Sequence, residues 1–418
     1  MSGLTAVERI LSRRVGREVR AGDLVVSPVD LVMAQDGNAP LAIRLLTEEL
    51  HADTTFDADK VVLVIDHCGP SPNDGASNLQ RMMRRFCEEQ GARLFDIGSG
   101  ISHVVLPEAG LAVPGTFVVG SDSHSVAYGA LNCLGTGMGS TDIAAAMYSG
   151  KTWLRVPASY QVNLTGRLPA DTAPKDLALE LIRRVGVAGA TYMCLEIGGP
   201  GLASLSVDAR LTICSMAIEM GAKTALMPCD ELVRDYLSSR SLPAGAPQWA
   251  DSDASYEKTI DIDLSEVGPL VALPHDLTRI VPVDSLNLPV QQAFVGTCTN
   301  SRLEDLRAAA GILRQRRIHP RVRMIVTPGS REVYLEALRE GVIETFVQAG
   351  AVVTPPGCGP CVGTHMGIPA DDETVISTAN RNFRGRMGNR NASIVLGSPE
   401  TVAASAVLGR VASAGSLS

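Results

Sequence analysis

Short apolar segments alternate with amphipathic segments along most of the chain. Continuous apolar runs of strand length, flanked by turn-forming residues, predict buried strands at 60–66, 116–124, 291–296 and 321–329. Apolar residues with helical spacing predict helices at 77–91, 141–150 and 303–317, and another that begins near residue 331. Thr141 is expected to cap the second of these helices. Strands that alternate with helices at this spacing indicate an α/β fold.

Two further segments bear on the organisation of the chain. The polar stretch 241–258 is expected to form an exposed loop, and a boundary near it separates a long N-terminal region from a C-terminal domain that starts around 286. Residues 1–20 lack the continuous apolar segment of a signal peptide, so we expect them to form an amphipathic first helix.

Composition narrows the class of protein. The 418 residues are 45% hydrophobic and 20% charged, which is typical of a soluble globular protein. We expect a cytoplasmic protein, because no apolar run reaches the roughly 18 residues of a membrane span. The net charge of −8 argues against a dedicated nucleic-acid binder. The basic run at 314–317 is expected to lie on a solvated helix face.

Nine cysteines are scattered irregularly along the sequence. An odd number of cysteines without a signal peptide does not suggest a disulfide framework. Most are expected to be small buried side chains, and Cys87, within the helix 77–91, is expected to be a packing residue.

Polar and reactive residues collect where the predicted strands end, which is where α/β folds place their sites. Six such groups suggest a common cleft: Asp66-His67, His103, Asp122-Ser123-His124, Cys298 to Ser301, Cys358 with Cys361, and Asn380 to Asn382. A lone histidine is more often a hydrogen-bonded core residue than a catalyst. Ser123 lacks the G-x-S-x-G context of a hydrolase nucleophile. The segment GTGMGSTD (135–142) lacks the third glycine of a dinucleotide loop and follows no clear strand.

The sequence PGCGPCVG (356–363) leaves three chemistries open for its two cysteines. They could form a redox pair, or a zinc site with the nearby His365. The surrounding glycines and prolines indicate a rigid loop instead. A third cysteine in a matching setting, Cys298 in VGTCTNSR, suggests an iron–sulfur cluster held by three thiolates. One iron would then carry no protein sulfur and could act as a Lewis acid.

Nine segments carry a resemblance that extends over nearly the whole chain. They are AQDGNAP, IDH, GSGISHVVLPEAG, PGTFVVGSDSHSVAYGA, GTGMGSTD, AIEMGAKT, GTCTNSRLEDLRAAA, PPGCGPCVG and NRNFRGRMG. In this order they make the chain similar to the aconitase superfamily, and more closely to the separate large subunits of isopropylmalate isomerase and homoaconitase. The resemblance implies three α/β/α domains, at 1–155, 156–285 and 286–418, packed around a cluster cleft. The swivel domain of the family is expected to be absent.

The resemblance also implies a cofactor and roles for site residues. Cys298, Cys358 and Cys361 would bind three irons of a [4Fe-4S] cluster, and the open fourth iron would bind the substrate. Asp66 and His67 match the pair that assists the departing hydroxyl. The other matched residues are His103 with Asp122, His124 with Glu219, the substrate contacts Gln35 and Ser123, and the cluster and carboxylate contacts Asn380, Arg381 and Arg386.

The implied reaction is a reversible dehydration and rehydration of a 2-hydroxy di- or tricarboxylate, with isopropylmalate isomerisation as the leading interpretation. Homoaconitase and dimethylmalate or methylmalate dehydratase large subunits are the alternatives. A cluster-free RNA-binding regulator and a structural zinc protein are the alternatives from other classes. Two departures from the family, Ser215 in ICSM and Ser125 in SDSHS, allow a different hydroxy acid.

The family's catalytic base is a serine in a Gly-Ser-Ser-Arg loop on the swivel domain. Here TPGSREV (327–333) has a single serine, and Ser238-Ser239-Arg240 has no preceding glycine. We therefore expect a small partner subunit to supply the serine base and an arginine.

Overall fold

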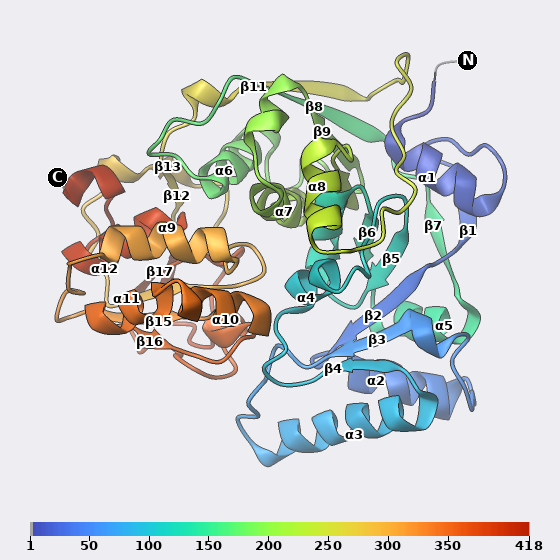
Figure 1. Ribbon diagram of the computed structural model, residues 1–418, viewed down its shortest axis with the longest axis horizontal. Helices are drawn as coiled ribbons and strands as arrows, with labels where there is room; N and C mark the ends of the chain where they lie inside the picture. The colour runs from blue at the N-terminus through green and yellow to red at the C-terminus, as the bar shows by residue number, and fades with distance from the viewer. Residues whose placement is uncertain (1–2, 418) are drawn as a thin grey trace.

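The apolar segments predicted as strands lie at the centres of the sheets. In the computed structural model, which describes residues 3–417, β3 (Val61–Val64), β5 (Phe117–Gly120) and β14 (Gln292–Val295) are buried along their whole length. Strands covered on both faces are typical of parallel sheets with helices on each side. Figure 1 shows helices packed on the sheets, with the two chain ends on opposite sides of the molecule.

The first sheet has five parallel strands in the order β4-β3-β2-β5-β6. Its remaining strands are β2 (Leu31–Gln35), β4 (Arg93–Phe95) and β6 (Leu134–Gly137). The helices of this region are α1 (Ala6–Val15), α2 (Ala39–Arg44), α3 (Asp74–Gln90), α4 (Ser102–Glu108) and α5 (Ser140–Ser149). An antiparallel ribbon of β1 (Leu24–Pro28) and β7 (Lys151–Arg155) completes it.

The second sheet has four parallel strands in the order β10-β9-β8-β11. The strands are β8 (Ser159–Thr165), β9 (Cys194–Gly198), β10 (Thr224–Leu226) and β11 (Lys258–Asp263). The helices are α6 (Pro174–Val185), α7 (Val207–Met216) and α8 (Glu231–Ser239).

The third sheet has seven strands in the order β13-β12-β18-β17-β14-β15-β16. Besides β14, the strands are β12 (Leu270–Ala272), β13 (Ile280–Pro282), β15 (Arg323–Val326), β16 (Val352–Val353), β17 (Thr374–Ser377) and β18 (Ser393–Leu396). Its helices are α9 (Leu303–Leu313), α10 (Arg331–Arg339), α11 (Val342–Ala349) and α12 (Pro399–Leu408). Strands β12 and β13 join this sheet although they precede residue 286. The proposed domain limits stay predictions, and sheet membership favours an earlier start for the third domain.

The predicted α/β fold is confirmed, and the differences lie at the ends of elements. Helix α1 occupies the predicted N-terminal segment, and Cys87 is buried in α3 as expected. Thr141 is not a cap, because α5 begins at Ser140 with Gly139 as the capping residue. Helix α9 ends at Leu313, so the basic run 314–317 lies in the turn after the helix and not on its face.

Two other sequence expectations need correction. The segment GTGMGSTD (135–142) begins within a strand, because Gly135, Thr136 and Gly137 are the last three residues of β6, and it ends within α5. The loop 241–258 has no helix or strand before β11, as predicted, but it is held against the first sheet region. Ala246 N donates to Pro114 O at 2.8 Å, and Gln248 N donates to Asn132 Oδ1 at 2.8 Å.

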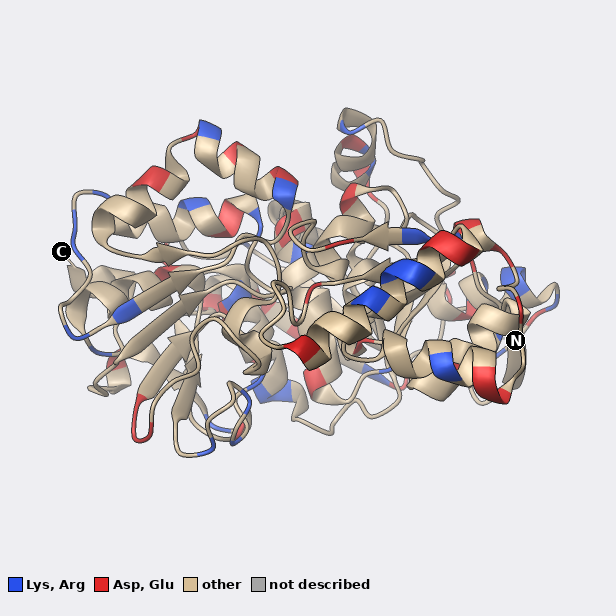
Figure 2. Ribbon diagram, turned by 90° about the horizontal axis from the view of Figure 1, so that it is seen from below, with Lys and Arg blue, Asp and Glu red and all other residues tan. Residues whose placement is uncertain are grey.

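The charged surface is mixed in sign. In Figure 2 blue and red segments alternate on the face that carries α3, whose sequence places arginines in its middle and glutamates near its end. A mixed surface does not provide the basic footprint that nucleic-acid binding requires. Among the described helices, none combines the length and apolar character needed to span a bilayer.

The first and second sheet regions meet through a backbone contact. The 3₁₀ segment η3 (Ser123–Leu131) passes β10, and Met227 N donates to Gly129 O at 2.9 Å. A Cβ atom added to Gly129 would lie 1.7 Å from the carbonyl oxygen of Ala225. Only glycine permits this approach, because backbone atoms on the other side cannot rotate away as a side chain can.

The Gly129→Ala substitution is therefore expected to lower the free energy of unfolding by at least about 1–3 kcal/mol, the usual cost of overpacking. Urea denaturation monitored by circular dichroism measures this change. Gly311→Ala is the matched control, since Gly311 lies in α9 with no atom within 4 Å of its added Cβ. The control should be neutral or stabilising, by up to about 1 kcal/mol. Equal stability of both variants would contradict the packing argument.

Candidate active site

The carboxyl ends of strands from the first and third sheets converge on one site. Strand β2 ends at Gln35, and β3 and β5 are followed by Asp66-His67 and Asp122-Ser123-His124. In the third sheet, the Cys298 loop follows β14, the Cys358–Cys361 loop follows β16, and Asn380-Arg381 follow β17. Hydrogen bonds join these groups across the two regions, as described below. His103 arrives from α4 and Glu219 from the short helix η5 (Ala217–Met220).

Asp36 organises the backbone around Asp66. Its Oδ1 accepts hydrogen bonds from the backbone N–H of Asp66 at 3.2 Å and His67 at 2.9 Å, and its Oδ2 accepts one from Cys68 at 3.0 Å. The side chain is buried, and burial together with the nearby Asp66 carboxylate raises the pKa of Asp36. Asp36 therefore sets the turn that presents the His67 side chain.

His67 lies between two carboxylates and a thiol. Its Nδ1 is 2.6 Å from Asp66 Oδ1 and 3.8 Å from Cys358 Sγ, and its Nε2 is 3.5 Å from Asp122 Oδ2. Burial alone would lower the pKa of His67, but Cys358, Asp66 and Asp122 raise it well above the ordinary value. The ring is therefore set up to carry a proton.

Asp122 contacts three imidazoles. Its Oδ1 is 2.9 Å from His103 Nε2 and 3.2 Å from His124 Nδ1, while Oδ2 faces His67. Burial would raise the pKa of Asp122, but the three histidines lower it well below the ordinary value. Asp122 is therefore a stable anion that orients the imidazoles around it.

A second carboxylate, Glu219, connects His124 to an arginine of the third region. His124 Nε2 is 3.0 Å from Glu219 Oε1, and Arg381 Nε donates to the same oxygen at 2.8 Å. Arg381 Nη2 also donates to Ser123 Oγ at 3.0 Å. Burial would raise the pKa of Glu219, and the hydrogen bonds and charge of His124 and Arg381 lower it. This chain of bonds places a guanidinium beside the Ser123 hydroxyl.

The three cysteines singled out from the sequence are buried free thiols next to these groups. Cys358 N donates to Asp66 O at 2.8 Å, which fixes the CxxC loop on the first sheet region. Gly359 has φ +56°, and a Cβ there would lie 2.5 Å from Thr327 Oγ1. The glycines therefore allow a tight 3₁₀ turn, η8 (Gly359–Val362), that carries Cys361.

Hydrogen-bond donors surround the sulfur atoms. Asn380 Nδ2 donates to Cys298 Sγ at 3.3 Å, and Arg386 Nη2 donates to Cys361 Sγ at 3.4 Å. Ser215 Oγ is 3.8 Å from Cys298 Sγ, and Ser125 Oγ donates to Asp122 O at 2.8 Å. The two residues that depart from the family pattern thus both contact the site.

The residues present fit an iron–sulfur cluster. Burial raises the pKa of the Cys298 thiol to about 12, a cost that coordination to iron would remove by stabilising the thiolate. Arg386 Nε is buried without a partner, consistent with a further acceptor in the site. The zinc set expected from the sequence, Cys358 and Cys361 with His365, is not gathered: His365 Nε2 lies 3.3 Å from Gly69 O. Among the described residues, the closely grouped candidate metal ligands are instead Asp66, His67 and Cys358.

Three buried site residues were not predicted from the sequence. Tyr128 OH lies 3.1 Å from His103 Nδ1, Asp36 holds the turn at Asp66, and Lys175 Nζ contacts the segments beside Cys298 and Asn380. Tyr128 and Asp36 lie inside motifs that were noted, SDSHSVAYGA and AQDGNAP. Lys175 begins an ordinary amphipathic helix, where a lysine signals only a solvated position.

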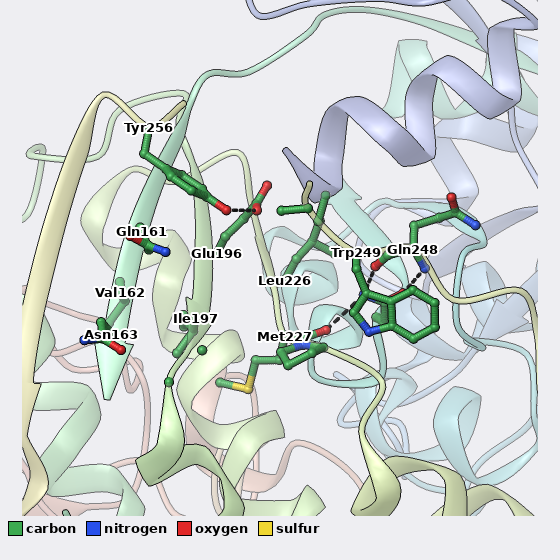
Figure 3. A pocket seen from close by; sticks show the side chains of 16 residues that line it. Gln161, Val162, Asn163, Glu196, Ile197, Leu226, Met227, Gln248, Trp249 and Tyr256 are labelled. Carbon is green, nitrogen blue, oxygen red and sulfur yellow. Dashed lines mark hydrogen bonds between the residues drawn. The ribbon is translucent and has the colours of Figure 1, made fainter. Parts of the chain in front are cut away.

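A separate cavity of about 140 Å³ lies beside the second sheet (Figure 3). Gln161, Val162 and Asn163 of β8 and Glu196 of β9 line it, with Trp249 from the loop 241–258 between α8 and β11. The Glu196 carboxylate is already bonded to Tyr256 OH, Ser159 Oγ and Val7 N. The Glu196 carboxylate therefore has a structural role, and the candidate catalytic residues lie instead around Asp122.

Comparison with known proteins identifies relatives over nearly the whole chain. The model of the aconitase family (aconitate hydratase) matches residues 8–409. The 3-isopropylmalate dehydratase large subunit 1 of Thermotoga maritima is 47% identical over 413 residues, which cover 98% of each chain. The homoaconitase large subunit of Thermus thermophilus is 47% identical, covering 97% of this chain and 96% of the relative.

A further relative and a solved structure are also similar to the chain. The 2,3-dimethylmalate dehydratase large subunit of Eubacterium barkeri is 43% identical and covers 98% of this chain and 99% of its own. The crystal structure of Thermococcus kodakaraensis aconitase X superposes with a TM-score of 0.52 at 14% identity, covering 90% of this chain and 89% of the other. That likeness concerns the fold.

Asp36→Asn is expected to destabilise the turn at Asp66, because an amide group cannot accept bonds from all three N–H groups. Each buried N–H left unsatisfied should cost roughly 1–3 kcal/mol of unfolding free energy. Urea denaturation of the cluster-free chain measures the loss. Asp57→Asn is the control, since Asp57 accepts one backbone N–H and forms an exposed ion pair with Lys60, so its loss should change stability by about 0.5 kcal/mol or less. A loss no larger than that of the control would show that Asp36 does not hold the turn.

Proposed function

This chain belongs to the aconitase family, and from that premise we propose that it is the cluster-binding large subunit of a hydro-lyase that isomerises isopropylmalate. The observation that carries the proposal is the placement of three buried free thiols beside the Asp122 cluster of histidines. Dehydration of a hydroxy acid needs an electrophile for the hydroxyl and a proton donor. The cluster held by the thiols would provide the electrophile, and the histidines would provide the proton.

Cys298, Cys358 and Cys361 are proposed to hold a [4Fe-4S] cluster. When bound, the cluster supplies an iron without a cysteine ligand, which polarises the C–O bond of the substrate. Asn380 and Arg386 donate to the sulfur atoms that hold it. Their side chains thereby stabilise the thiolate form.

The other residues bind the substrate and move the proton. Arg381 is proposed to bind a substrate carboxylate through its guanidinium, with Ser123 and Gln35 as further contacts. His67 holds a proton whose retention is favoured by Asp66 and Asp122, and delivers it from Nε2 to the departing hydroxyl. His103 and His124 keep the Asp122 carboxylate in place for this step.

The base that removes the proton next to the carboxylate is proposed to come from a small subunit. The serines of this chain that resemble the family loop serve structural roles. Ser330 caps α10 and donates to Glu108 Oε1 at 2.8 Å, and Ser238 and Ser239 donate to backbone carbonyls of α8. The relatives' names as large subunits support a small partner subunit. That partner is proposed to supply the serine base and an arginine.

Besides isopropylmalate, two other hydroxy acids are candidate substrates. The relatives include a homoaconitase and a 2,3-dimethylmalate dehydratase at similar identity, so identity does not separate the substrates. The side-chain pocket is proposed to be completed by the small subunit. The mixed-sign surface gives no support to an RNA-binding regulator.

Anaerobic reconstitution should load about four irons per wild-type chain, as expected for one [4Fe-4S] cluster. Cys298→Ser, Cys358→Ser and Cys361→Ser should each lose most of this iron and the absorbance of the cluster. Cys87→Ala, a buried cysteine of α3 away from the site, should retain both. One zinc in place of the iron would overturn the cofactor assignment.

The cluster-loaded chain alone should show no turnover, because it lacks the base. Adding the small subunit encoded with it should produce dehydration, measured by absorbance of the unsaturated product. A panel of isopropylmalate, dimethylmalate and the homoaconitase substrate, ranked by kcat/KM, identifies the hydroxy acid. Turnover by the single chain would refute the proposed division of the site.

A further inference from the structure

A lysine is completely buried behind the cysteine site. Lys175 is the second residue of α6 and has no exposed surface. Its Nζ donates to the carbonyl oxygens of Ala379 at 2.8 Å and Thr378 at 3.0 Å. Thr299 Oγ1 at 3.4 Å and Met216 Sδ at 3.7 Å complete its surroundings. All its direct contacts are therefore neutral.

No carboxylate among residues 3–417 forms an ion pair with this ammonium group. The adjacent Asp176 is engaged elsewhere, since its two oxygens accept the backbone N–H groups of Ala173 at 2.8 Å and Leu270 at 2.9 Å. A buried charge without a counterion is costly, so proteins rarely keep one without a reason. Burial lowers the pKa of Lys175 to about 8, while Cys298, Asp305 and Cys361 act to raise it.

The contacts of Lys175 place it directly behind Cys298. Thr299 follows Cys298 in the chain, and Met216 follows Ser215, whose hydroxyl faces the Cys298 sulfur. Thr378 and Ala379 precede Asn380, which donates to the same sulfur. Helix α6 of the second sheet region thus places one positive charge against the Cys298–Thr299 and Thr378–Asn380 loops, which enclose this thiol.

We propose that Lys175 is the internal counterion of the cluster, an inference that rests on the cluster binding proposed above. Three thiolates and the inorganic sulfides bring negative charge into a buried site, where charges interact strongly. Arg386 and Arg381 supply positive charge from the third region, and Lys175 supplies it from the opposite, second region. Lys175 is a positioning residue, because it acts through the cluster and its loops and not on the substrate.

The proposal predicts the direction of a redox shift. One-electron reduction of the cluster, with the electron supplied by a chemical reductant, adds a negative charge. Replacing Lys175 by a neutral residue should make that reduction less favourable. Lys175→Met keeps the length of the side chain without its charge. Lys175→Gln also removes the charge, and its amide can still donate to one of the two carbonyls if the methionine variant fails to fold.

The experiment is a mediated redox titration of the reconstituted chains, followed by electron paramagnetic resonance. Both variants should lower the ratio of reduced to oxidised cluster at least tenfold at a given potential, equivalent to about 59 mV for one electron. Lys223→Met is the matched control. Lys223 Nζ lies 3.5 Å from Gly137 O, burial lowers its pKa, and its charged neighbour is Asp142. Its removal should leave the potential unchanged.

Thermal unfolding provides the second measurement. Cluster loading should raise the Tm of Lys175→Met and Lys175→Gln less than that of the wild type, because the charge pair is missing. A purely structural lysine would lower the Tm of the cluster-free and loaded forms equally and leave the potential unshifted. That result would overturn the proposal. Failure of the wild type to bind iron would instead refute the proposed function, so the two failures are distinguishable.

Discussion

The Asp122 carboxylate is the interaction on which the arrangement of the site depends. It contacts His67, His103 and His124, which belong to separate segments of the first sheet region. Through His124 and Glu219 it is connected to Arg381 in the third region, and through His67 to the Cys358 loop. Asp122 is only partly buried, but loss of this anion would still leave several polar groups unpaired. The catalytic geometry and the packing of the regions therefore rely on one charge.

The site is assembled from charges that alternate in sign. Carboxylates of Asp66, Asp122 and Glu219 lie next to histidines and Arg381, and the thiols lie next to Arg386 and, one layer further, Lys175. Such an arrangement is stable only if most members are present, since removal of one partner exposes another as an uncompensated buried charge. This explains why a charged group such as Lys175, which is not proposed to contact the substrate, is buried behind the thiols.

The sequence predicted the site residues that lie directly after the carboxyl ends of parallel strands. Parallel strands of one sheet end at the same edge, so the groups after β3 and β5 could be expected to meet, and they do. The Cys298 loop reaches them from β14 of the third sheet, which strand direction alone does not determine. Residues whose role depends on the direction of a single side chain were not foreseeable. Lys175 and Tyr128 are examples, because helical spacing alone cannot show whether a polar side chain faces solvent or a buried site. Thr141 and the basic run at 314–317 failed for a local reason: helix ends are decided by backbone geometry within one turn.

The backbone contact between Gly129 and β10 has a kinetic consequence. Met227 N–H and Gly129 C=O share a hydrogen bond where the two regions touch, and Ala225 leaves no space for sliding. This contact resists relative motion of the first and second sheet regions, so the site does not open easily at this junction. The proposed small subunit, which would complete the site, is then the part whose movement would admit the substrate. With the proposed small subunit in place, release of product would likewise require that subunit to tilt or separate.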